Sequence, residues 1–328
     1  MSESASTTRE RTKLVVTVPL TDAHLARLRQ RFPLVDVTVA TSDDLTTAIA
    51  TADAAAVWGL TGEQVAAAGR LRWVQTGGAG IDPAMLAALA ARGVPVTNNS
   101  GVHAINIGEH VLAMMLAFAR RLPDLLRAQD RHEWRDDWYS ERVFELQGQH
   151  LVVVGLGDLG LSVADRAVGF GMRITGVRRR PGRPLPANFG AVTTLDDLPA
   201  ALATADHVAL CLPLTDRTRG LFNAEMIART KPGAFLYNVG RGQLVDTDAL
   251  IAALQTGHLA GAGLDVTDPE PLPPDSPLWD LGNVIITAHT SGGTPHYWDR
   301  GLDILETNLT RFLNGQPLTN VVDPAEGY

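Results

Sequence analysis

Short apolar runs alternate along the chain with longer segments in which apolar residues recur every three or four positions. The first five apolar runs are predicted strands, at 14–20, 35–40, 54–59, 72–76 and 94–99. Segments such as 22–32 and 62–71 separate them and have helical periodicity. Strands that alternate with helices in this way are typical of a parallel sheet with helices on both faces.

A second set of strands begins at residue 150 and predicts a second α/β unit. Its apolar runs are HLVVVG (150–155), RITGV (173–177), HVALCL (207–212), AFLYNV (234–239), AGLDV (262–266) and NVIIT (283–287). Long helical segments at 101–122 and 294–315 stand before and after this set. We therefore expect the second unit to be inserted in the first, with the last helix returning to the N-terminal unit. A plain tandem arrangement is the alternative.

The predicted fold class is thus α/β, with two doubly wound parallel-sheet domains. Residues 1–102 and 292–328 form one domain in this prediction, and residues 103–291 form the other. The length of 328 residues suits two domains of roughly 150 residues each. The net charge of −8 argues against a general nucleic-acid or membrane-surface role, so any anion site must be built locally.

The cysteine content and the N-terminus bear on location. Cys211 lies in an apolar run and cannot form an internal disulfide, which predicts a buried thiol in a reducing compartment. The first dozen residues are polar and lack the apolar core of a signal peptide. No stretch is long and apolar enough to span a membrane, so a cytoplasmic location is expected.

The second set opens on a glycine turn, VVVGLGDLG, between a predicted strand and a predicted helix. Gly155, Gly157 and Gly160 form the pattern G-x-G-x-x-G, with Asp158 and Leu159 before the last glycine. In this context the pattern favours a dinucleotide: Gly155 allows a tight turn, Gly157 admits a pyrophosphate, and Gly160 lets helix and strand pack closely. The helix N-terminus adds N–H groups for the phosphates. An ordinary strand-to-helix turn is the alternative.

Three arginines, Arg178, Arg179 and Arg180, follow the next strand. A carboxylate at this place would accept hydrogen bonds from an adenosine ribose. A guanidinium suits a phosphate instead, because it is always charged and presents several donors in a plane. We therefore predict NADP as the cofactor, with NAD as the alternative, and Arg178 and Arg179 nearest the 2′-phosphate. A solvated basic loop is the other interpretation.

Three segments carry polar residues directly after predicted strands of the second set. They are NVGRGQLVD with Arg241, LDVTDPEPL with Glu270, and AHTSGGT with His289. In an open parallel sheet, ligands bind beyond the carboxyl ends of the strands, so we expect all three side chains on one rim.

The chain resembles the D-isomer-specific 2-hydroxyacid dehydrogenase family over nearly its whole length. The glycine turn, LPLTDRTRGLF, NVGRGQLVD, LDVTDPEPL and HTSGGT occur in the order and spacing of that family. The resemblance implies a flavodoxin-like substrate domain, split in sequence around an inserted Rossmann cofactor domain. It also implies a homodimer formed through the cofactor domain, and NAD(P)H-dependent reduction of a 2-keto acid to a D-2-hydroxy acid.

The family's catalytic residues are an Arg, a Glu and a His, which by motif match are Arg241, Glu270 and His289. In the roles that the resemblance implies, His289 donates a proton, Glu270 stabilises and orients the imidazolium, and Arg241 grips the substrate carboxylate and polarises the ketone. Taken singly, they could equally be a strand-capping histidine, a loop charge and a surface ion pair. The remaining cofactor-binding positions are Leu212, Pro213, position 219, Val239, Gly240, Gly292 and Asp265, the last facing the nicotinamide carboxamide.

The N-terminal unit offers a second glycine-rich loop, VQTGGAGID (74–82). Its backbone N–H groups are open to an anion, and the family places its substrate carboxylate here, around Gly78, Ala79 and Gly80. A tight turn without a ligand is the alternative. Trp58 and Leu60, after the third strand, are candidates for the wall that faces the substrate's side chain.

Other residue patterns concern partners and metals. Trp134, Trp138 and Tyr139 lie among charges in segment 131–146, which predicts an interface, and one of these tryptophans could reach the partner's active site. The histidines on helical segments lack the spacing of metal ligands, so no metal is predicted; they are His103, His110 and His296.

Two other functions share this fold. Formate oxidation needs no proton donor, whereas a Glu–His pair is expected here. Nucleotide-sensing corepressors use long partner-binding tails, and the segments outside the two units are short here. The favoured partner is therefore a small 2-keto acid, with no nucleic acid and no membrane. Glyoxylate and hydroxypyruvate are the first candidates, and bulkier aliphatic, aromatic or phosphono-substituted keto acids remain open.

Overall fold

The chain folds as two compact units in a computed structural model, which describes residues 11–136, 143–179 and 189–325. Unit 1 is Met1–Val102 with Pro295–Tyr328, and unit 2 is His103–Thr294. Both ends of the chain belong to unit 1, which excludes a tandem arrangement. The second boundary follows residue 294 and not 291, because the carbonyls of Ser291 and Gly292 are bound by Asn106 and His103 of unit 2.

A five-stranded parallel sheet forms the centre of unit 1, in the order β2-β1-β3-β4-β5. The strands are β1 (Thr12–Val16), β2 (Val35–Val39), β3 (Ala54–Val57), β4 (Trp73–Thr76) and β5 (Val96–Thr97). The helices are α1 (Asp22–Arg31), α2 (Leu45–Ile49), α3 (Gly62–Ala67), α4 (Pro83–Ala90) and α11 (Tyr297–Leu313).

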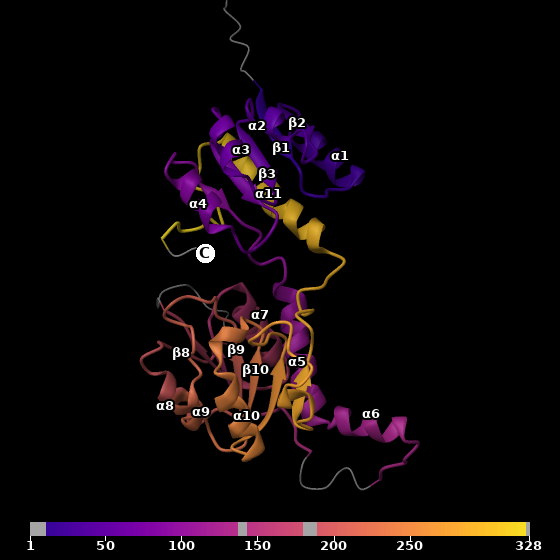
Figure 1. The fold of residues 1–328 in the computed structure, drawn as a ribbon. Coiled ribbons are helices and arrows are strands. Elements are labelled where there is room, and N and C mark those ends of the chain that lie inside the picture. Colours follow the sequence, from indigo (N-terminus) through magenta and orange to yellow (C-terminus); the bar gives the residue numbers. More distant parts are fainter. Residues whose placement is uncertain (1–10, 137–142, 180–188, 326–328) are drawn as a thin grey trace, which may run out of the picture. The chain divides into compact units, whose positions relative to one another are not determined.

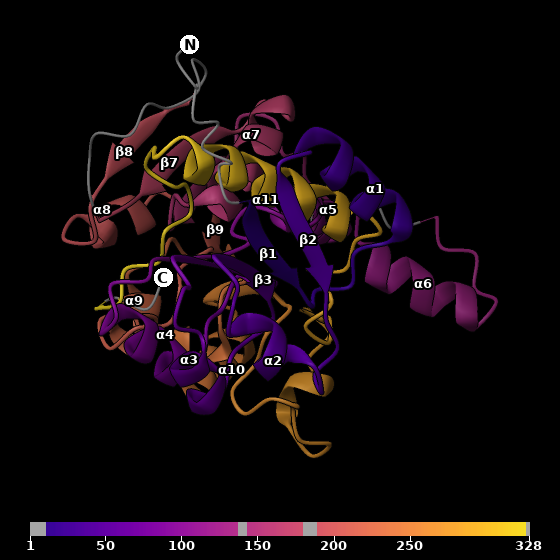
Figure 2. The same ribbon diagram turned by 90° about the horizontal axis from the view of Figure 1, so that it is seen from above.

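Successive side chains of each strand point to opposite faces of this sheet, and both faces are buried. Leu14 and Val16 of β1 pack with Leu28 of α1 and Leu305 of α11 on one face. Val15 packs in the cluster that α2, α3 and α4 form on the other face. Figure 2 shows α1 and α11 on one side of β1 and β3, and α2 and α3 on the opposite side. The return of α11 to this sheet closes unit 1.

A seven-stranded parallel sheet forms the centre of unit 2, in the order β12-β11-β10-β9-β6-β7-β8. The strands are β6 (His150–Val154), β7 (Arg173–Val177), β8 (Ala191–Thr193), β9 (His207–Leu210), β10 (Ala234–Asn238), β11 (Leu259–Leu264) and β12 (Val284–Ile286). The strand order reverses between β6 and β9, as in the Rossmann fold. The predicted fold class is therefore confirmed.

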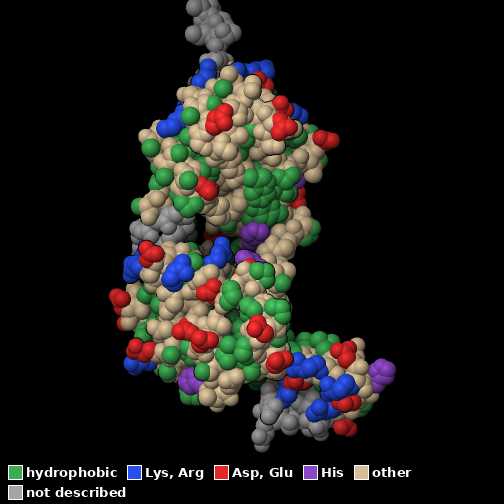
Figure 3. Space-filling view, viewed as in Figure 1, with side chains coloured by type: hydrophobic (Ala, Val, Ile, Leu, Met, Phe, Trp, Pro, Cys, Tyr) green, Lys and Arg blue, Asp and Glu red, His purple; other side chains and the backbone are tan. Residues whose placement is uncertain are grey.

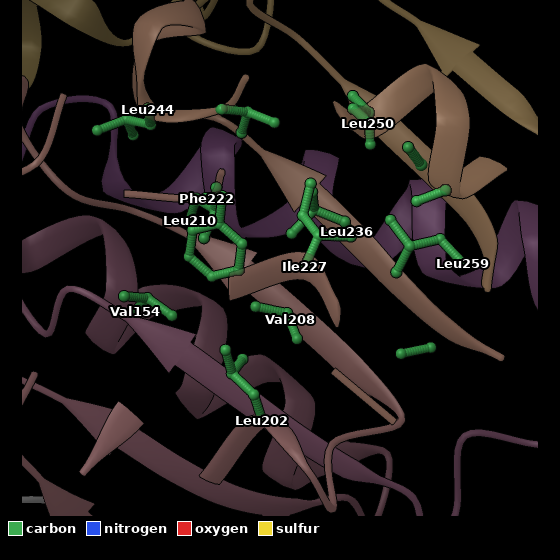
Figure 4. Packing of buried hydrophobic residues seen from close by; sticks show 14 of the residues in the cluster. Val154, Leu202, Val208, Leu210, Phe222, Ile227, Leu236, Leu244, Leu250 and Leu259 are labelled. Carbon is green, nitrogen blue, oxygen red and sulfur yellow. The ribbon is translucent and has the colours of Figure 1, made fainter. Parts of the chain in front are cut away.

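Helices cover the two faces of this second sheet: α5 (Ala104–Ala119), α7 (Asp158–Gly169), α8 (Leu198–Leu202), α9 (Ala224–Ala228) and α10 (Thr247–Gln255). Helix α6 (Leu122–Asp130) follows α5 and lies outside these two layers, and η1 (Gly242–Leu244) and η2 (Pro277–Trp279) are short 3₁₀ turns. Leu202 of α8, Ile227 of α9 and Leu250 of α10 pack on one face, over Val154 and Val208 (Figure 4). Helices α5 and α7 bury their apolar residues against the other face.

Three elements and one thiol differ from or agree with the sequence prediction in informative ways. Strand β8 and helix α6 were not predicted: β8 has three residues at the sheet edge, and α6 begins at Leu122, where the predicted long helix ends. The last helix, predicted over 294–315, spans Tyr297–Leu313, and Gly315 follows its C-cap with a φ of 63°. Burial raises the pKa of the Cys211 thiol to about 12, so this thiol is structural. Among the described residues, no helix has both the length and the apolar character that crossing a membrane requires.

Candidate active site

Three glycines shape the turn between β6 and α7, each for its own steric reason. A Cβ at Gly160 would lie 1.9 Å from the carbonyl oxygen of Gly155, and a Cβ at Gly155 would lie 2.8 Å from that of Cys211. Apart from Gly157 and its two chain neighbours, no heavy atom of the described residues lies within 4 Å of the place where Gly157 would carry a Cβ. Packing inside the protein therefore requires glycine at 155 and 160. The open space at Gly157 fits the close approach of a pyrophosphate.

The N-terminus of α7 completes this turn. Gly157 is the N-cap residue, and no side chain of the described residues caps the helix. Asp158 and Leu159 form the first turn and are half-exposed. The first turn of a helix presents N–H groups without partners inside the helix, together with the positive end of the helix dipole. A helix of 12 residues that begins in this way fits the phosphates of a dinucleotide.

Arg178 and Arg179 directly follow β7, the strand next to the glycine turn. The backbone N–H of Arg178 donates to the carbonyl of Thr193 on β8 at 3.1 Å, so the unpredicted edge strand holds this arginine in place. Arg178 is half-buried and Arg179 is exposed. Arg180 lies outside the described residues.

The segment after β9 corrects one predicted position. Position 219, predicted to be a cofactor-binding threonine, is Arg219, and the threonine next to it is Thr218. The Thr218 hydroxyl is buried; it donates to the carbonyl of Pro213 and accepts from the N–H of Thr215, both at 2.8 Å. Thr218 therefore closes the turn that carries Leu212 and Pro213 instead of facing a ligand.

The segment after β10 packs against the one after β9. A Cβ at Gly240 would lie 2.7 Å from the carbonyl oxygen of Leu212. The side chain of Val239 is buried in the core of unit 2, so only the backbone of Val239 is available to a ligand.

His289 and Glu270 form a direct pair on the rim of the sheet. The imidazole Nδ1 lies 2.6 Å from Glu270 Oε1, and the side chains are 49% and 41% exposed. Because a carboxylate only accepts, the hydrogen of this bond sits on Nδ1. The other ring nitrogen, Nε2, is then the one that can exchange a proton with a bound molecule.

Arg241 lies on the neighbouring segment, after β10, and its backbone is fixed by close packing. A Cβ at Gly242 would lie 1.8 Å from the carbonyl oxygen of Thr267, which presses this segment against the one after β11. The Arg241 side chain is exposed, and its Nη1 donates to the carbonyl of Gly240 at 2.7 Å. Within the described residues, no hydrogen bond joins Arg241 to His289 or Glu270. The guanidinium therefore keeps donors for a ligand.

Asp265 ties down the loop that carries His289. Its buried carboxylate accepts from the Thr287 hydroxyl at 2.7 Å, the Thr290 N–H at 2.9 Å, and the N–H and hydroxyl of Ser291. Its carbonyl accepts from the His289 N–H at 2.8 Å. The resemblance placed Asp265 against a nicotinamide carboxamide, and that role stays a prediction. What the structure shows is a carboxylate that organises the loop 287–291.

The glycine-rich loop after β4 lies in unit 1. Its carbonyls are occupied: Gly77 by Asn99 Nδ2 at 3.0 Å, Gly78 by the Asn99 N–H at 3.0 Å, and Ala79 by Asn98 Nδ2 at 2.8 Å. In the part of the chain that the structure describes, nothing accepts from the N–H groups of Gly78, Ala79 and Gly80. A loop with bound carbonyls and open N–H groups suits an anion.

Trp58, directly after β3, lies beside this loop. Its ring would lie 3.1 Å from a Cβ at Gly77, and it meets Trp298 of α11 edge-on, with ring centroids 5.5 Å apart. The indole is nevertheless 57% exposed, which is unusual for so large an apolar side chain. Leu60, predicted beside it, is buried in the core of unit 1 and lines no surface.

Comparison with known proteins assigns the family. The family model described as D-isomer specific 2-hydroxyacid dehydrogenase, NAD binding domain, matches residues 112–291. The chain belongs to the D-isomer specific 2-hydroxyacid dehydrogenase family. The membership that the motifs predicted is thereby confirmed, and unit 2 contains the family's NAD-binding domain.

Relatives within the 2-hydroxyacid dehydrogenase family carry several names. D-3-phosphoglycerate dehydrogenase of Mycobacterium tuberculosis is 38% identical over 272 residues, 81% of this chain but 50% of that protein, so the chain spans about half the length of this relative. Glyoxylate/hydroxypyruvate reductase B of Yersinia pestis is 35% identical over 77% of this chain and 78% of its own length. The crystal structure of a D-isomer specific 2-hydroxyacid dehydrogenase from Xanthobacter autotrophicus Py2, in complex with NADPH and MES, is 33% identical, with a TM-score of 0.79, covering 97% of this chain and 100% of that one.

Sequence reasoning missed three residues on α5 and its N-cap that hold the His289 loop of this member of the 2-hydroxyacid dehydrogenase family. The contacts are His103 Nδ1 to the carbonyl of Gly292 at 2.7 Å, Asn106 Nδ2 to the carbonyl of Ser291 at 2.6 Å, and His110 Nε2 to Thr287 Oγ1 at 3.0 Å. Gly292, predicted to contact the cofactor, therefore also anchors the loop. The available signal was spacing: polar residues at 103, 106 and 110 share one face of a mostly apolar helix.

Proposed function

We propose that the protein reduces a 2-keto acid to a D-2-hydroxy acid with NADPH. The contact of 2.6 Å between His289 Nδ1 and Glu270 Oε1 carries the proposal, because it supplies an oriented proton donor on the rim of an NAD-binding domain. NADPH, when bound, supplies the hydride that the carbonyl carbon of the substrate receives. Formate oxidation requires no proton donor, so it would not use this His–Glu pair.

His289 moves the proton. In the imidazolium form, the ring carries hydrogens on both nitrogens, and Glu270 accepts the one on Nδ1. The Nε2–H bond breaks as the bond from hydrogen to the carbonyl oxygen forms, so the keto group becomes a hydroxyl. Glu270 stabilises the charged ring before this step and holds its orientation after it. In the oxidation direction the neutral Nε2 accepts the proton.

Arg241 binds and polarises the substrate in this proposal. Its guanidinium is always charged and presents several donors, which suit a carboxylate and a carbonyl oxygen. The bond from Nη1 to the carbonyl of Gly240 uses one donor and steadies the side chain. The contact of Gly242 with Thr267 fixes where the side chain starts.

Unit 1 is the substrate domain in this proposal. The open N–H groups of Gly78, Ala79 and Gly80 bind the carboxylate of the substrate, and Trp58 contacts its side chain. The bound loop carbonyls and the exposed indole beside Gly77 support this assignment. Unit 2 is the cofactor domain, with the phosphates at Gly157 and the N-terminus of α7.

Preference for NADPH over NADH is assigned to Arg178 and Arg179, with Arg180 as the third arginine of the run. The 2′-phosphate carries negative charge, and two guanidinium groups follow β7 where a carboxylate would repel that phosphate. The related dehydrogenase from Xanthobacter autotrophicus Py2 was crystallised in complex with NADPH, which agrees with this assignment.

The protein is proposed to form a homodimer through unit 2. Helix α6 extends away from the rest of unit 2 (Figure 1), with Leu122 and Leu126 on one face, 45% and 58% exposed. Trp134, just after it, is 93% exposed, while Trp138 and Tyr139 lie outside the described residues. Apolar side chains lie among the charged ones over this segment (Figure 3). A second copy would cover them.

Analytical sedimentation tests the proposed dimer. The Leu126→Glu variant should lose the dimer, whereas the control variant Leu313→Glu on α11 should keep it.

A cytoplasmic location is part of the proposal. The single cysteine of the protein, Cys211, is buried and forms no disulfide, which suits a reducing compartment. Fractionation of cells that express the full chain tests the location.

The central experiment measures NADPH oxidation by the full chain with a panel of 2-keto acids. The panel contains glyoxylate, hydroxypyruvate, and branched aliphatic, aromatic and phosphono-substituted 2-keto acids, each also with NADH. We expect turnover of at least one substrate, release of the D enantiomer, and loss of about 100-fold or more in kcat for His289→Gln. Absence of turnover across the panel, or an unaffected His289→Gln variant, would contradict the proposal.

A further inference from the structure

A chain of hydrogen bonds joins helix α5 to the loop that carries His289. His110 Nε2 lies 3.0 Å from Thr287 Oγ1, which in turn lies 2.7 Å from Asp265 Oδ1. With Asp265 as a carboxylate, the Thr287 hydroxyl must donate to it, because a carboxylate only accepts. The oxygen of Thr287 is then left to accept from His110, which places a hydrogen on His110 Nε2. The direction of every bond in the chain is thereby determined.

This chain of hydrogen bonds ends at the loop 287–291, whose backbone conformation has to be maintained by contacts with the rest of unit 2. His289 has a φ of 53°, in the left-handed region that residues other than glycine rarely adopt. Such a conformation persists only where the surroundings enforce it. Here Asp265 binds residues on both sides of His289: Thr287 before it, and Thr290 and Ser291 after it. The orientation of the Asp265 carboxylate thus controls the position of the imidazole.

Helix α5 is a suitable anchor for the loop 287–291 because it packs closely against two other elements of unit 2. A Cβ at Gly108 would lie 2.8 Å from the Ser162 hydroxyl of α7. On another side, Met114 Sδ would lie 2.6 Å from a Cβ at Gly263 of β11. Val111 and Met115 are fully buried between these contacts. Movement of the helix would therefore disturb packing on two elements, whereas the loop 287–291 contains mostly exposed residues.

We propose that His110 is a positioning residue for the proton donor His289. Its Nε2–H aims the Thr287 hydroxyl at Asp265, and Asp265 then holds the loop so that His289 stays in contact with Glu270. The side chain of His110 is 22% exposed and touches neither His289 nor Glu270 among the described contacts, so it acts through the loop. The inference rests on the proposed function, in which His289 donates the proton.

The test compares His110→Leu with His110→Gln in the full chain. Leucine removes the donor to Thr287, whereas the side-chain amide of glutamine retains one. We expect kcat for the best 2-keto acid to fall about 10-fold to 100-fold in His110→Leu, because small displacements of a reacting group have effects of this size. KM should change less than about threefold, and His110→Gln should recover most of kcat. A wild-type kcat in His110→Leu, or no recovery in His110→Gln, overturns the proposal.

His258→Leu is the matched control. His258 Nε2 contacts the hydroxyl of Thr230 at 3.1 Å, the same kind of bond, just before β11 at the opposite end of that strand from Asp265. Removal of this bond should leave kcat within about twofold of wild type. An equal fall of kcat in both variants would mean general loosening of unit 2 and would overturn a specific role for His110.

A double-mutant cycle and a spectroscopic readout keep the test independent of substrate identity. Thr287→Val should reproduce the loss of kcat seen in His110→Leu. The double variant should lose little more kcat, since both substitutions interrupt the same chain of hydrogen bonds. Additive losses would overturn the proposal. In carbon-13 histidine spectra, the ring signal of His289, assigned by its absence in His289→Gln, should shift in His110→Leu but not in His258→Leu. This readout stands even if no 2-keto acid is turned over, so failure of the proposed function and failure of the positioning role are distinguishable.

Discussion

His289 Nδ1 lies 2.6 Å from Glu270 Oε1, although 19 residues of chain separate the two. The contact is possible because β11 and β12 are neighbours in the sheet, so the segments that follow them share one edge. The Glu270 carboxylate fixes which ring nitrogen carries the hydrogen toward it. Nε2 is thereby assigned to the substrate.

The first prediction concerns this pair. Glu270→Gln removes the negative charge that accepts the hydrogen on His289 Nδ1, so the imidazole should be held less firmly in the orientation that presents Nε2 to the substrate. We expect kcat for reduction to fall about 10-fold to 100-fold. Steady-state kinetics measure this, with Glu225→Gln, an exposed residue of α9, as control. An unchanged kcat would remove Glu270 from this role.

The glycine turn gives a matched pair of variants. Gly157→Ala adds a methyl group to open space, so we expect the free energy of unfolding to change by less than about 1 kcal/mol. Affinity for NADPH should fall about 10-fold or more, because the methyl group would lie where the proposed function puts the pyrophosphate. Gly160→Ala places its Cβ 1.9 Å from a backbone oxygen and should destabilise the fold by about 3 kcal/mol or more. Urea unfolding and fluorescence titration with NADPH separate the two effects. Wild-type affinity in Gly157→Ala would argue against a cofactor there.

A second binding prediction concerns the arginines after β7. Arg178→Ala should raise KM for NADPH about 10-fold to 100-fold, the size expected for hydrogen bonds to a charged group. KM for NADH should change less than about threefold, since NADH has no 2′-phosphate. Arg173→Ala, at the exposed start of β7, is the control. Equal losses with both cofactors would assign Arg178 to structure and not to discrimination.

Trp58 should decide which side chains the substrate can carry. Trp58→Ala removes a large apolar contact, so we expect kcat/KM for an aromatic 2-keto acid to fall about 10-fold. Glyoxylate has no side chain to contact the indole, and its kcat/KM should change less than about threefold. Trp279→Ala, 51% exposed in unit 2, is the control. Parallel losses for both substrates would show that Trp58 lines no side-chain pocket.

The last prediction concerns stability and pH. His207 is fully buried, its ring stacks on those of Phe235 and Tyr237, and burial lowers its pKa to about 4. The unfolded chain therefore binds the extra proton between pH 4 and about 6.5, where the folded protein does not. Stability from this group is complete above pH 6.5 and is lost as the pH falls to 4, by about 3 kcal/mol. The difference between the urea midpoints at pH 7.5 and pH 5 should be smaller in His207→Phe than in the wild type. In the control His296→Phe, this difference should equal that of the wild type. The same difference in His207→Phe as in wild type would contradict this.

The order of elements and the family were open to prediction, because both depend on local patterns. Apolar runs and helical periodicity gave two parallel-sheet units, and the motifs around Gly155, Arg241, Glu270 and His289 gave the family. The last helix was also predicted, over 294–315, close to the observed Tyr297–Leu313. Strand β8 was missed because three residues carry too little pattern.

The tertiary structure alone decided which residues support the site. Val239 was expected near the cofactor, yet its side chain is buried in the core, and the threonine expected at position 219 is Arg219, beside a buried Thr218 that closes a turn. His110 looked like an isolated histidine on a helix, but the fold brings it to Thr287, which is 177 residues away in sequence. Local patterns are set by neighbours along the chain, so sequence carries them directly. Contacts such as that of His110 with Thr287 depend on which strands are adjacent and how closely α5 packs, and only folding settles those distances.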